Sequence, residues 1–220
     1  EAKLLGGHDS AQHKVSRRVR VHGRGPLADS VLAQVRAAGI RAVGSYGPAT
    51  DVQRRWRKDF VILTDNLIVD PQLVADLMSA RVPHLLVRLR DGHGVVGPLV
   101  LPGQTSCLRC ADLLRRELDE QWPRMSAQLL GRTGTASPAT INATAAIALE
   151  QISVALHGDV RHPPRSLGAT LEIDLDLHQA RLRWWPPRPD CGCAVQHAEL
   201  SLPSPPRTAR SLAAAPSGTR

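Results

Sequence analysis

Aromatic residues and lysine are scarce in this chain of 220 residues. It contains one phenylalanine, one tyrosine and four tryptophans, and its basic residues are almost all arginines. Proteins that bind single-stranded nucleic acids combine basic residues with several aromatic side chains on which the bases stack. The net charge of +8 comes from arginines scattered along the chain. We therefore expect no nucleic acid partner.

The sequence also lacks a long apolar run and a secretory leader. A helix that spans a bilayer needs roughly 18 or more consecutive apolar residues, and we find no such run. No charged and then apolar leader follows Glu1. We therefore expect no membrane partner and a cytoplasmic location. The start at Glu1 rather than at a methionine raises the expectation that an N-terminal domain is missing.

Cysteine is scarce too, and its placement is informative. All four cysteines lie in two tight pairs, Cys107-Leu-Arg-Cys110 and Cys191-Gly-Cys193. A structural zinc ion takes four sulfur or nitrogen ligands at tetrahedral corners, which two chelating pairs from distant parts of a chain can supply. We predict one structural zinc bound by Cys107, Cys110, Cys191 and Cys193, which leaves no cysteine to act as a nucleophile.

Two alternatives to zinc stay open at this point. The four cysteines can form two disulfides or remain free thiols, although paired thiols without a secretory signal favour a reducing compartment. The first pair can also serve a thioredoxin-like redox role, which would require it to lie at the start of a helix.

Strands and helices alternate along the predicted fold. Short apolar runs predict strands at 19–21, 40–43, 60–63, 85–89 and 95–101. Apolar residues at helical spacing predict helices at 26–38, 73–78, 107–114 and 139–156. This alternation favours an α/β fold, with a Rossmann-like, mainly parallel sheet and helices on both faces. Apolar and polar residues alternate at 171–177, which predicts a strand. The segment 179–185 is its predicted hairpin partner, so both are expected as C-terminal antiparallel strands.

The chain divides into three segments by composition. Residues 1–14 are polar and contain glycine without any period, which predicts a linker. Residues 15–200 carry the periodic structure and both cysteine pairs, so we expect one zinc-containing domain there. Residues 201–220 are dominated by proline, serine, alanine and arginine, which predicts a disordered tail.

A glycine turn follows the first predicted strand. Gly23-Arg-Gly25-Pro-Leu-Ala28 has the Gly-x-Gly-x-x-Ala spacing of a dinucleotide-binding turn. In that fold the first glycine makes the turn, the second lets the backbone approach a phosphate, and the small third residue lets helix and strand pack closely. The acidic residue that would hold a ribose is missing after the second strand, which argues against an NAD or FAD oxidoreductase. The glycines then serve either a nucleotide or the tight turn alone.

The order of these features resembles the ThiF/MoeB/HesA family, which has the ubiquitin-activating-like adenylating fold. The matching features lie within residues 18–195 and are the glycine turn, Thr64-Asp65-Asn66 after the third strand, the two cysteine pairs, and the helix at 143–157. Family members hold a structural zinc and use Mg-ATP to adenylate the C-terminal carboxylate of a small sulfur-carrier or ubiquitin-like protein.

This resemblance implies that Gly23, Gly25, Ala28, Asp65 and Asn66 frame a nucleotide site, with Asp65 as the magnesium-contacting acid. A carboxylate just past a parallel strand lies at the ligand-binding edge of the sheet, which agrees with that role. Alternatively, Asp65 and Asn66 only cap the turn that follows the strand.

The chain departs from active family members between the second and third strands, where they clamp the triphosphate. Only residues 44–59 are present there, and the basic run at 54–58 around Trp56 favours a solvated helix face over a clamp. This short form resembles the ThiF-like proteins attached to azole-forming cyclodehydratases of thiazole/oxazole-modified peptide biosynthesis, as do the segments 97–103 and 121–129.

That branch implies a scaffold that recruits a precursor peptide to a YcaO-type enzyme, without adenylation activity of its own, with a peptide-gripping winged helix N-terminal to the domain. The alternative is an ATP-dependent adenylyltransferase that activates a ubiquitin-like or sulfur-carrier protein. We expect the partner surface to include exposed aromatic residues, with Trp122, Trp184 and Trp185 as candidates. A homodimer is left open.

Overall fold

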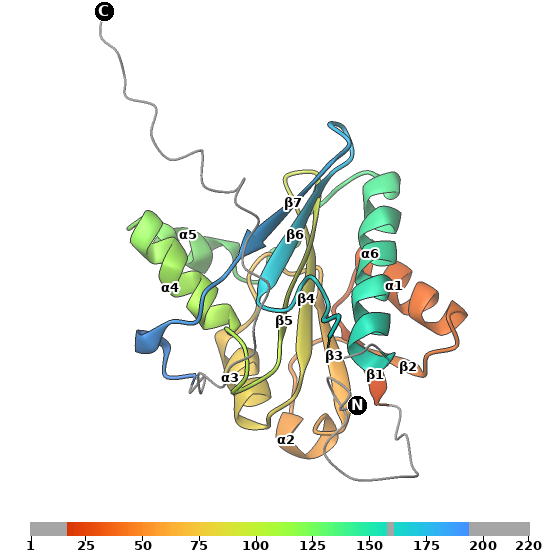
Figure 1. The fold of residues 1–220 in the computed structure, drawn as a ribbon, viewed down its shortest axis with the longest axis horizontal. Helices are drawn as coiled ribbons and strands as arrows, with labels where there is room; N and C mark the ends of the chain where they lie inside the picture. Colours follow the sequence, from red (N-terminus) through yellow and green to blue (C-terminus); the bar gives the residue numbers. More distant parts are fainter. Residues whose placement is uncertain (1–16, 158–160, 194–220) are drawn as a thin grey trace, which may run out of the picture.

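A computed structural model describes residues 17–157 and 161–193, which form one seven-stranded sheet covered by helices (Figure 1). The strands are β1 (Arg18–His22), β2 (Ala42–Ser45), β3 (Asp59–Thr64), β4 (His84–Arg90), β5 (His93–Val100), β6 (Ala169–Asp174) and β7 (Gln179–Trp184). The helices are α1 (Pro26–Ala37), α2 (Val52–Arg55), α3 (Pro71–Ser79), α4 (Leu108–Leu118), α5 (Trp122–Leu129), α6 (Pro138–His157) and the 3-10 helix η1 (Pro189–Cys191). The predicted α/β class is confirmed, whereas the predicted linker and tail lie outside the described residues.

The strand direction changes in the middle of the sheet. The order is β2-β1-β3-β4-β5-β6-β7, with parallel pairing from β2 to β4 and antiparallel pairing from β4 to β7. A two-residue turn joins β4 to β5, and both its residues have positive φ, 52° at Asp91 and 84° at Gly92. Such turns match the twist of a tight antiparallel hairpin, and an Asp-Gly pair favours them. The parallel centre and the antiparallel C-terminal strands agree with the prediction.

Most strand boundaries lie within two residues of the prediction, and the differences at β2 and at the end of β6 are the informative ones. Strand β2 begins at Ala42 and ends at Ser45, two residues later than predicted. Strand β6 ends at Asp174 rather than at 177, because the Asp174 carboxylate accepts a hydrogen bond from the Leu177 N–H at 3.0 Å and so closes a turn. The alternating pattern at 171–177 therefore continues past the strand into the turn.

Helices cover both faces of the sheet. Figure 1 shows α1 and α6 side by side on one face, where they enclose one apolar core. Helices α2, α3 and the start of α4 enclose a second core on the other face, and three of the four cysteines belong to it. Helix α6 approaches β5 closely because Gly94 has no side chain: a Cβ atom there would lie 2.0 Å from Thr144 Oγ1.

Helix α6 is the one helix of the described residues that is long and apolar enough to cross a membrane, by length and composition alone. The helix contains no uninterrupted apolar run of that length, since Asn142, Glu150 and Gln151 interrupt it, so it qualifies by its mean hydropathy and not by the criterion used on the sequence. The helix packs one face against α1 and the sheet, as core helices do.

Candidate functional site

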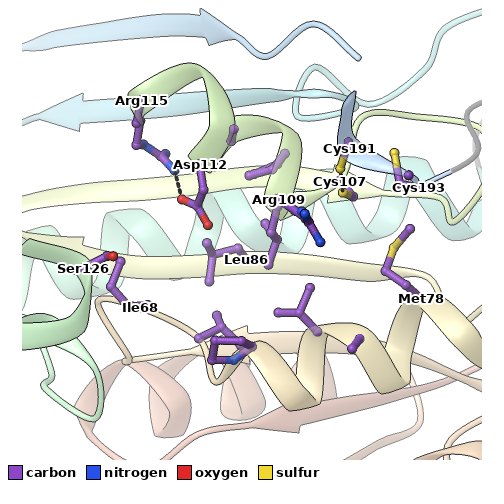
Figure 2. A pocket seen from close by; sticks show the side chains of 18 of the residues that line it. Ile68, Met78, Leu86, Cys107, Arg109, Asp112, Arg115, Ser126, Cys191 and Cys193 are labelled. Atoms are coloured by element: carbon purple, nitrogen blue, oxygen red, sulfur yellow. Dashed lines mark hydrogen bonds and ion pairs between the residues drawn. The ribbon is translucent and has the colours of Figure 1, made fainter. Parts of the chain in front are cut away.

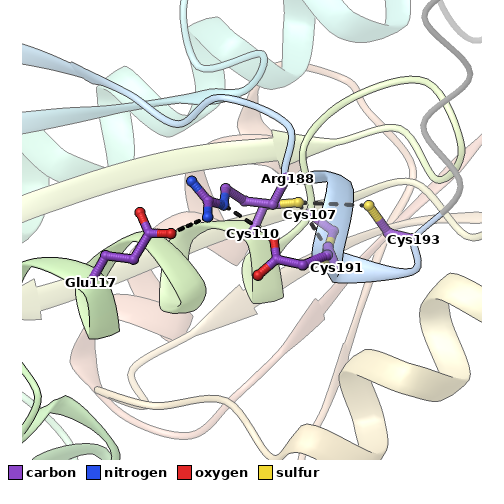
Figure 3. A network of polar contacts seen from close by, with 7 residues as sticks. Cys107, Cys110, Glu117, Arg188, Cys191 and Cys193 are labelled. Atoms are coloured by element: carbon purple, nitrogen blue, oxygen red, sulfur yellow. Dashed lines mark hydrogen bonds and ion pairs between the residues drawn. The ribbon is translucent and has the colours of Figure 1, made fainter.

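The two cysteine pairs come together at one point of the fold (Figure 3). Cys107 and Cys110 lie at the start of α4, while Cys191 ends η1 and Cys193 follows it. The four sulfur atoms all lie within 4.8 Å of one another. The Sγ–Sγ distances are 3.9 Å between Cys107 and Cys110, 3.5 Å between Cys107 and Cys191, and 3.6 Å between Cys110 and Cys193.

These distances fit a tetrahedral zinc site. Four sulfur atoms at about 2.3 Å from a central zinc lie about 3.8 Å from one another. A disulfide would bring two of them to about 2.05 Å, and the four cysteines are free. Cys107 is the N-cap of α4, so the helix start required by a redox role is present. A redox pair needs only two cysteines, however, whereas four sulfurs meet here.

The local environment makes thiolates costly unless a cation is bound. Burial raises the pKa of the Cys191 thiol to about 12. The pKa of Cys107 is raised as well, first by its hydrogen bond to Cys110 and then by burial, while the same hydrogen bond lowers the pKa of Cys110. Zinc binds thiolates and stabilises them, so it would reverse the effect of burial at Cys107 and Cys191.

A polar network next to the cysteines joins η1 to α4 (Figure 3). The Arg188 Nε donates to Asp190 Oδ1 at 3.3 Å, and the same guanidinium forms an ion pair with Glu117 on α4. This network holds the segment that carries Cys191 and Cys193 beside the helix that carries the other pair.

The glycine turn and Asp65 also lie together, at the carboxyl ends of β1 and β3. Strand β1 lies between β2 and β3, so the chain crosses from β1 to β2 on one side and then to β3 on the other side. The carboxyl ends of β1 and β3 therefore lie at a switch point, which is where ligands bind in open α/β sheets. A Cβ atom at Gly23 would lie 2.0 Å from Thr64 Oγ1, and one at Gly25 would lie 2.7 Å from Asp65 Oδ1. The two glycines therefore make room for the end of β3.

Asp65 is buried in this position, with 5% of its surface exposed. Its φ of 69° is left-handed, and its Oδ2 atom has no hydrogen-bond partner among the described residues. Burial raises the pKa of its carboxyl group, although hydrogen bonds from Thr64 and from the N–H groups of Ala28 and Leu27 oppose the shift. Ala28 is buried beside it, as its small size predicted. The carboxyl group thus faces the N-terminus of α1, where helices commonly bind anions.

Asn66 is covered by a distant part of the chain. Its N–H donates to Thr64 O at 2.8 Å, and it forms a bridge with Thr133. A second bridge joins Ile68 to Leu130, so the segment 130–134 crosses over the end of β3. This backbone pairing fits the turn-capping interpretation of Asp65 and Asn66.

A small polar cavity of about 230 Å³ lies beside the glycine turn, at the ends of β1 and β2. His22, Ser45 and Arg55 are among the residues that line it, and none of its lining residues is acidic. Ser45 ends β2, and its hydroxyl is 3.1 Å from His22 Nδ1. The residue at the end of β2 is therefore a serine, which offers no carboxylate for a ribose. The basic residues at 54–58 are exposed to solvent, as predicted, and Trp56 among them is buried.

Sequence reasoning missed a larger cavity, of about 450 Å³, between α3 and α4 (Figure 2). Its lining is mainly apolar but includes the side chains of Arg88, Arg109 and Arg115. The one feature of the sequence that could have indicated this cavity is Arg88, a charged residue within the apolar run at 85–89.

The three candidate tryptophans differ in exposure. Trp185 is buried, with its Nε1 donating to Thr170 Oγ1 at 2.7 Å and the Arg115 guanidinium 4.3 Å from its ring centre. Its prediction as an exposed anchor is therefore wrong, because it completes the packing between the sheet and α4. Trp122 and Trp184 are half-buried.

Comparisons with known proteins identify the fold. No protein-family model matches the sequence, and no curated protein matches it. A heterocyclase solved with substrate and cofactor matches 82% of this chain at 17% identity and a TM-score of 0.62. The heterocyclase TruD matches 82% of it at 19% identity and a TM-score of 0.60. Escherichia coli MccB, solved with MccA-N7isoASN, matches 83% of it at 15% identity and a TM-score of 0.61.

The coverage of these proteins differs. This chain spans 26% and 28% of the two heterocyclase chains, and 68% of the MccB chain. At such low identities the likeness establishes the fold. The chain therefore has the ThiF-like α/β fold, found in heterocyclases and MccB, that its sequence resemblance implied.

Proposed function

We propose that this chain is a ThiF-like scaffold that recruits a precursor peptide to a YcaO-type enzyme of an azole-forming cyclodehydratase system, without adenylation activity of its own. Two of the similar structures are heterocyclases, and one of them contains its substrate. The MccB structure was solved in complex with MccA-N7isoASN. These likenesses support a role in peptide modification.

The position of Asp65 carries the proposal that adenylation is absent. Helix N-termini bind phosphate through free N–H groups and the helix dipole. At α1 those groups face the Asp65 carboxyl, which is almost fully buried against Gly23 and Gly25. A triphosphate would have to displace this carboxyl group or approach it through a bound cation. The exposed basic run of α2 points to the same conclusion, because phosphoryl chemistry depends on positioned charges.

Calorimetry with Mg-ATP tests this part of the proposal. We expect no binding at micromolar concentrations by the full chain, by Asp65→Asn or by the control Asp29→Asn, which changes an exposed acid of α1. Micromolar affinity that Asp65→Asn abolishes and Asp29→Asn retains would sink the scaffold proposal and identify Asp65 as a cation ligand.

Exposed apolar side chains around α5 support a contact with the partner. None of the residues of α5 is buried, and the exposed apolar side chains on it and next to it are Leu118 at the end of α4 (74%), Met125 (39%) and Leu130 (49%). Trp122 begins α5. We propose that the YcaO-type enzyme or its precursor peptide contacts this α5 surface, because aromatic and methionine side chains are enriched at interfaces.

Co-purification measures this recruitment. We expect the full chain to retain a YcaO-type enzyme together with its precursor peptide, and Met125→Asp to weaken retention at least tenfold. Ala127→Asp places the same charge on an exposed, smaller residue of α5 as a control for the charge alone. Equal retention by wild type and both variants would remove α5 from the interface, and failure to retain either component would remove the recruiting role.

The second candidate function is an ATP-dependent adenylyltransferase acting on a ubiquitin-like or sulfur-carrier protein. A structure of Escherichia coli MccB with ATP has the same fold, at 15% identity and a TM-score of 0.60. The polar cavity beside the glycine turn, with Arg20 and Arg55 in its lining, is the local feature that favours this candidate. Pyrophosphate release that requires a ubiquitin-like acceptor would establish it.

A further inference from the structure

We propose that the cavity between α3 and α4 binds a small molecule with an apolar body and one carboxylate, and that Arg88 is the anchor for that carboxylate. This inference is independent of the proposed function. The cavity shares no lining residue with the glycine turn or with Asp65.

The size and lining of the cavity suit a small apolar ligand. Its volume of about 450 Å³ lies within the range of roughly 300–1,000 Å³ that is typical of small-molecule sites. Apolar side chains come from both walls, including Val74 and Met78 on α3 and Leu108 and Ala111 on α4, with Leu86 of β4 at the base. Figure 2 shows Met78 and Arg109 on opposite sides of the space.

Arg88 is the unusual residue of this lining. It lies in the middle of β4 between apolar residues, and 6% of its surface is exposed. Its Nη1 donates to the carbonyl oxygen of Leu67, but its Nε has no hydrogen-bond partner among the described residues. No described carboxylate lies within 4.0 Å of this guanidinium. A buried charge without a partner is costly, so a ligand that pairs with it would gain binding energy.

The charges around the cavity favour an anion. Besides Arg88, Arg109 and Arg115 line it, Asp112 is its single carboxylate, and Cys107, Cys191 and Cys193 of the cysteine cluster lie at one end of it. Asp112 accepts a hydrogen bond from Arg115 Nη1 at 2.8 Å, so its charge is already paired. Burial lowers the pKa of Arg88 to about 10, which still leaves it protonated at neutral pH.

The chemistry of the anion follows from this balance. Arginine pairs with a carboxylate through two parallel N–H donors, and Arg88 keeps an unused Nε for such a pair. A phosphate would bring a second negative charge into a mainly apolar space, where its desolvation costs more. A monoanionic carboxylate with a hydrocarbon chain satisfies both the charge and the apolar walls.

Titration of the full chain with octanoate, by calorimetry or NMR, tests the inference. We expect saturable binding of one octanoate per chain, and at least tenfold weaker binding of octanamide, which has the same chain without the charge. Arg88→Met should weaken octanoate binding at least tenfold. Arg116→Met, on an exposed part of α4 outside the cavity, should leave it unchanged.

Two further arms keep the test decisive. Ala75→Phe lies on an exposed position of α3 that lines the cavity, so it should block octanoate while every charge and the fold remain intact, as circular dichroism would confirm. A tetrapeptide ending in leucine also carries a carboxylate, but on a peptide backbone. Its titration therefore distinguishes a hydrocarbon acid from a peptide C-terminus as the ligand. Absence of octanoate binding at millimolar concentration, equal binding of octanamide, binding that survives both Arg88→Met and Ala75→Phe, or binding of the peptide alone would overturn the inference.

Discussion

Asp65 illustrates how one residue can decide between two uses of the same fold. A carboxylate after a parallel strand can hold a cation that bridges phosphates, but here it lies against Gly23 and Gly25 at the N-terminus of α1. The two glycines leave room for Thr64 and Asp65 at the end of β3. The position of the aspartate in the sequence is the same for a cation ligand and for a buried turn residue. The burial of its side chain distinguishes the two roles.

The raised pKa of Asp65 predicts a pH-dependent stability. The contribution of its neutral form is fully present below the ordinary carboxyl pKa of about 3.9 and is lost as the pH rises through the raised pKa of the folded state. Asp65→Asn keeps the neutral form at every pH. We expect it to raise the Tm at pH 7.5 by a few degrees, on the order of 1 kcal/mol.

Thermal unfolding at several pH values measures this effect. The difference between Asp65→Asn and wild type should shrink toward zero as the pH falls to about 4, the range where the carboxyl group protonates in the unfolded chain. Asp176→Asn, at an exposed position in the turn between β6 and β7, should show no such pattern. A lower Tm for Asp65→Asn at pH 7.5 would contradict the account and indicate that the carboxylate has a charged partner.

The cysteines allow a second prediction at the scale of residues. Because a structural metal binds the folded state, Cys191→Ser should lower stability, by about 4 kcal/mol if zinc normally exceeds its dissociation constant a thousandfold. Metal analysis should find close to one zinc per wild-type chain. Arg188→Ala removes the neighbouring ion pairs but no ligand, so it should retain zinc. Well under one zinc per chain, with two disulfides formed, would falsify the zinc assignment.

At the scale of elements, the contact between α6 and β5 depends on a missing side chain. Gly94 lies directly under Thr144, whose hydroxyl donates to Thr140 O at 2.6 Å inside the helix. Gly94→Ala would therefore push α6 away from the sheet. We expect a loss of about 1–3 kcal/mol in the free energy of unfolding.

A double-mutant cycle tests this contact. Thr144→Ala removes the hydroxyl that the new Cβ atom would meet, so Gly94→Ala should cost clearly less in that background. Equal costs in both backgrounds would show that the clash lies elsewhere, for example in the strand backbone.

The elements also show how far the sequence predicts this structure. Apolar runs such as 60–63 and 85–89 are long enough to predict buried parallel strands, and Pro26 and Gly39 bracket α1 closely. Helix α5 escaped prediction because it has only eight residues and none of them is buried, so its apolar pattern is too short to stand out. Strand β6 ended early because a side-chain hydrogen bond, rather than the alternation, determines its end.

The candidate sites divide in the same way. The cysteine cluster was predictable because metal ligands have characteristic local spacings, and its four sulfur atoms do meet. The cavity between α3 and α4 was not, because it arises from the packing of segments far apart in the chain. Even Arg88 is distinctive only once its burial and its unpaired Nε are known.

At the scale of the whole molecule, a ThiF-like fold carries a zinc-type cysteine cluster at one place and a buried carboxyl group, that of Asp65, beside the glycine turn at another. The cluster connects the end of the sheet to α4, at a distance from the glycine turn in the fold, as Figure 1 shows for α4 and α1. The proposal that the chain is a scaffold and not an adenylating enzyme rests on this buried carboxyl group.

The exchange of labelled pyrophosphate into ATP tests this central claim most directly. The full chain would be assayed with Mg-ATP, alone and with a precursor peptide, a YcaO-type enzyme or a ubiquitin-like acceptor. The account predicts no exchange above background from this chain alone or with either the peptide or the acceptor, and no change in the exchange of the YcaO-type enzyme when Asp65→Asn replaces the wild type. Exchange by the chain itself that Asp65→Asn abolishes would contradict it.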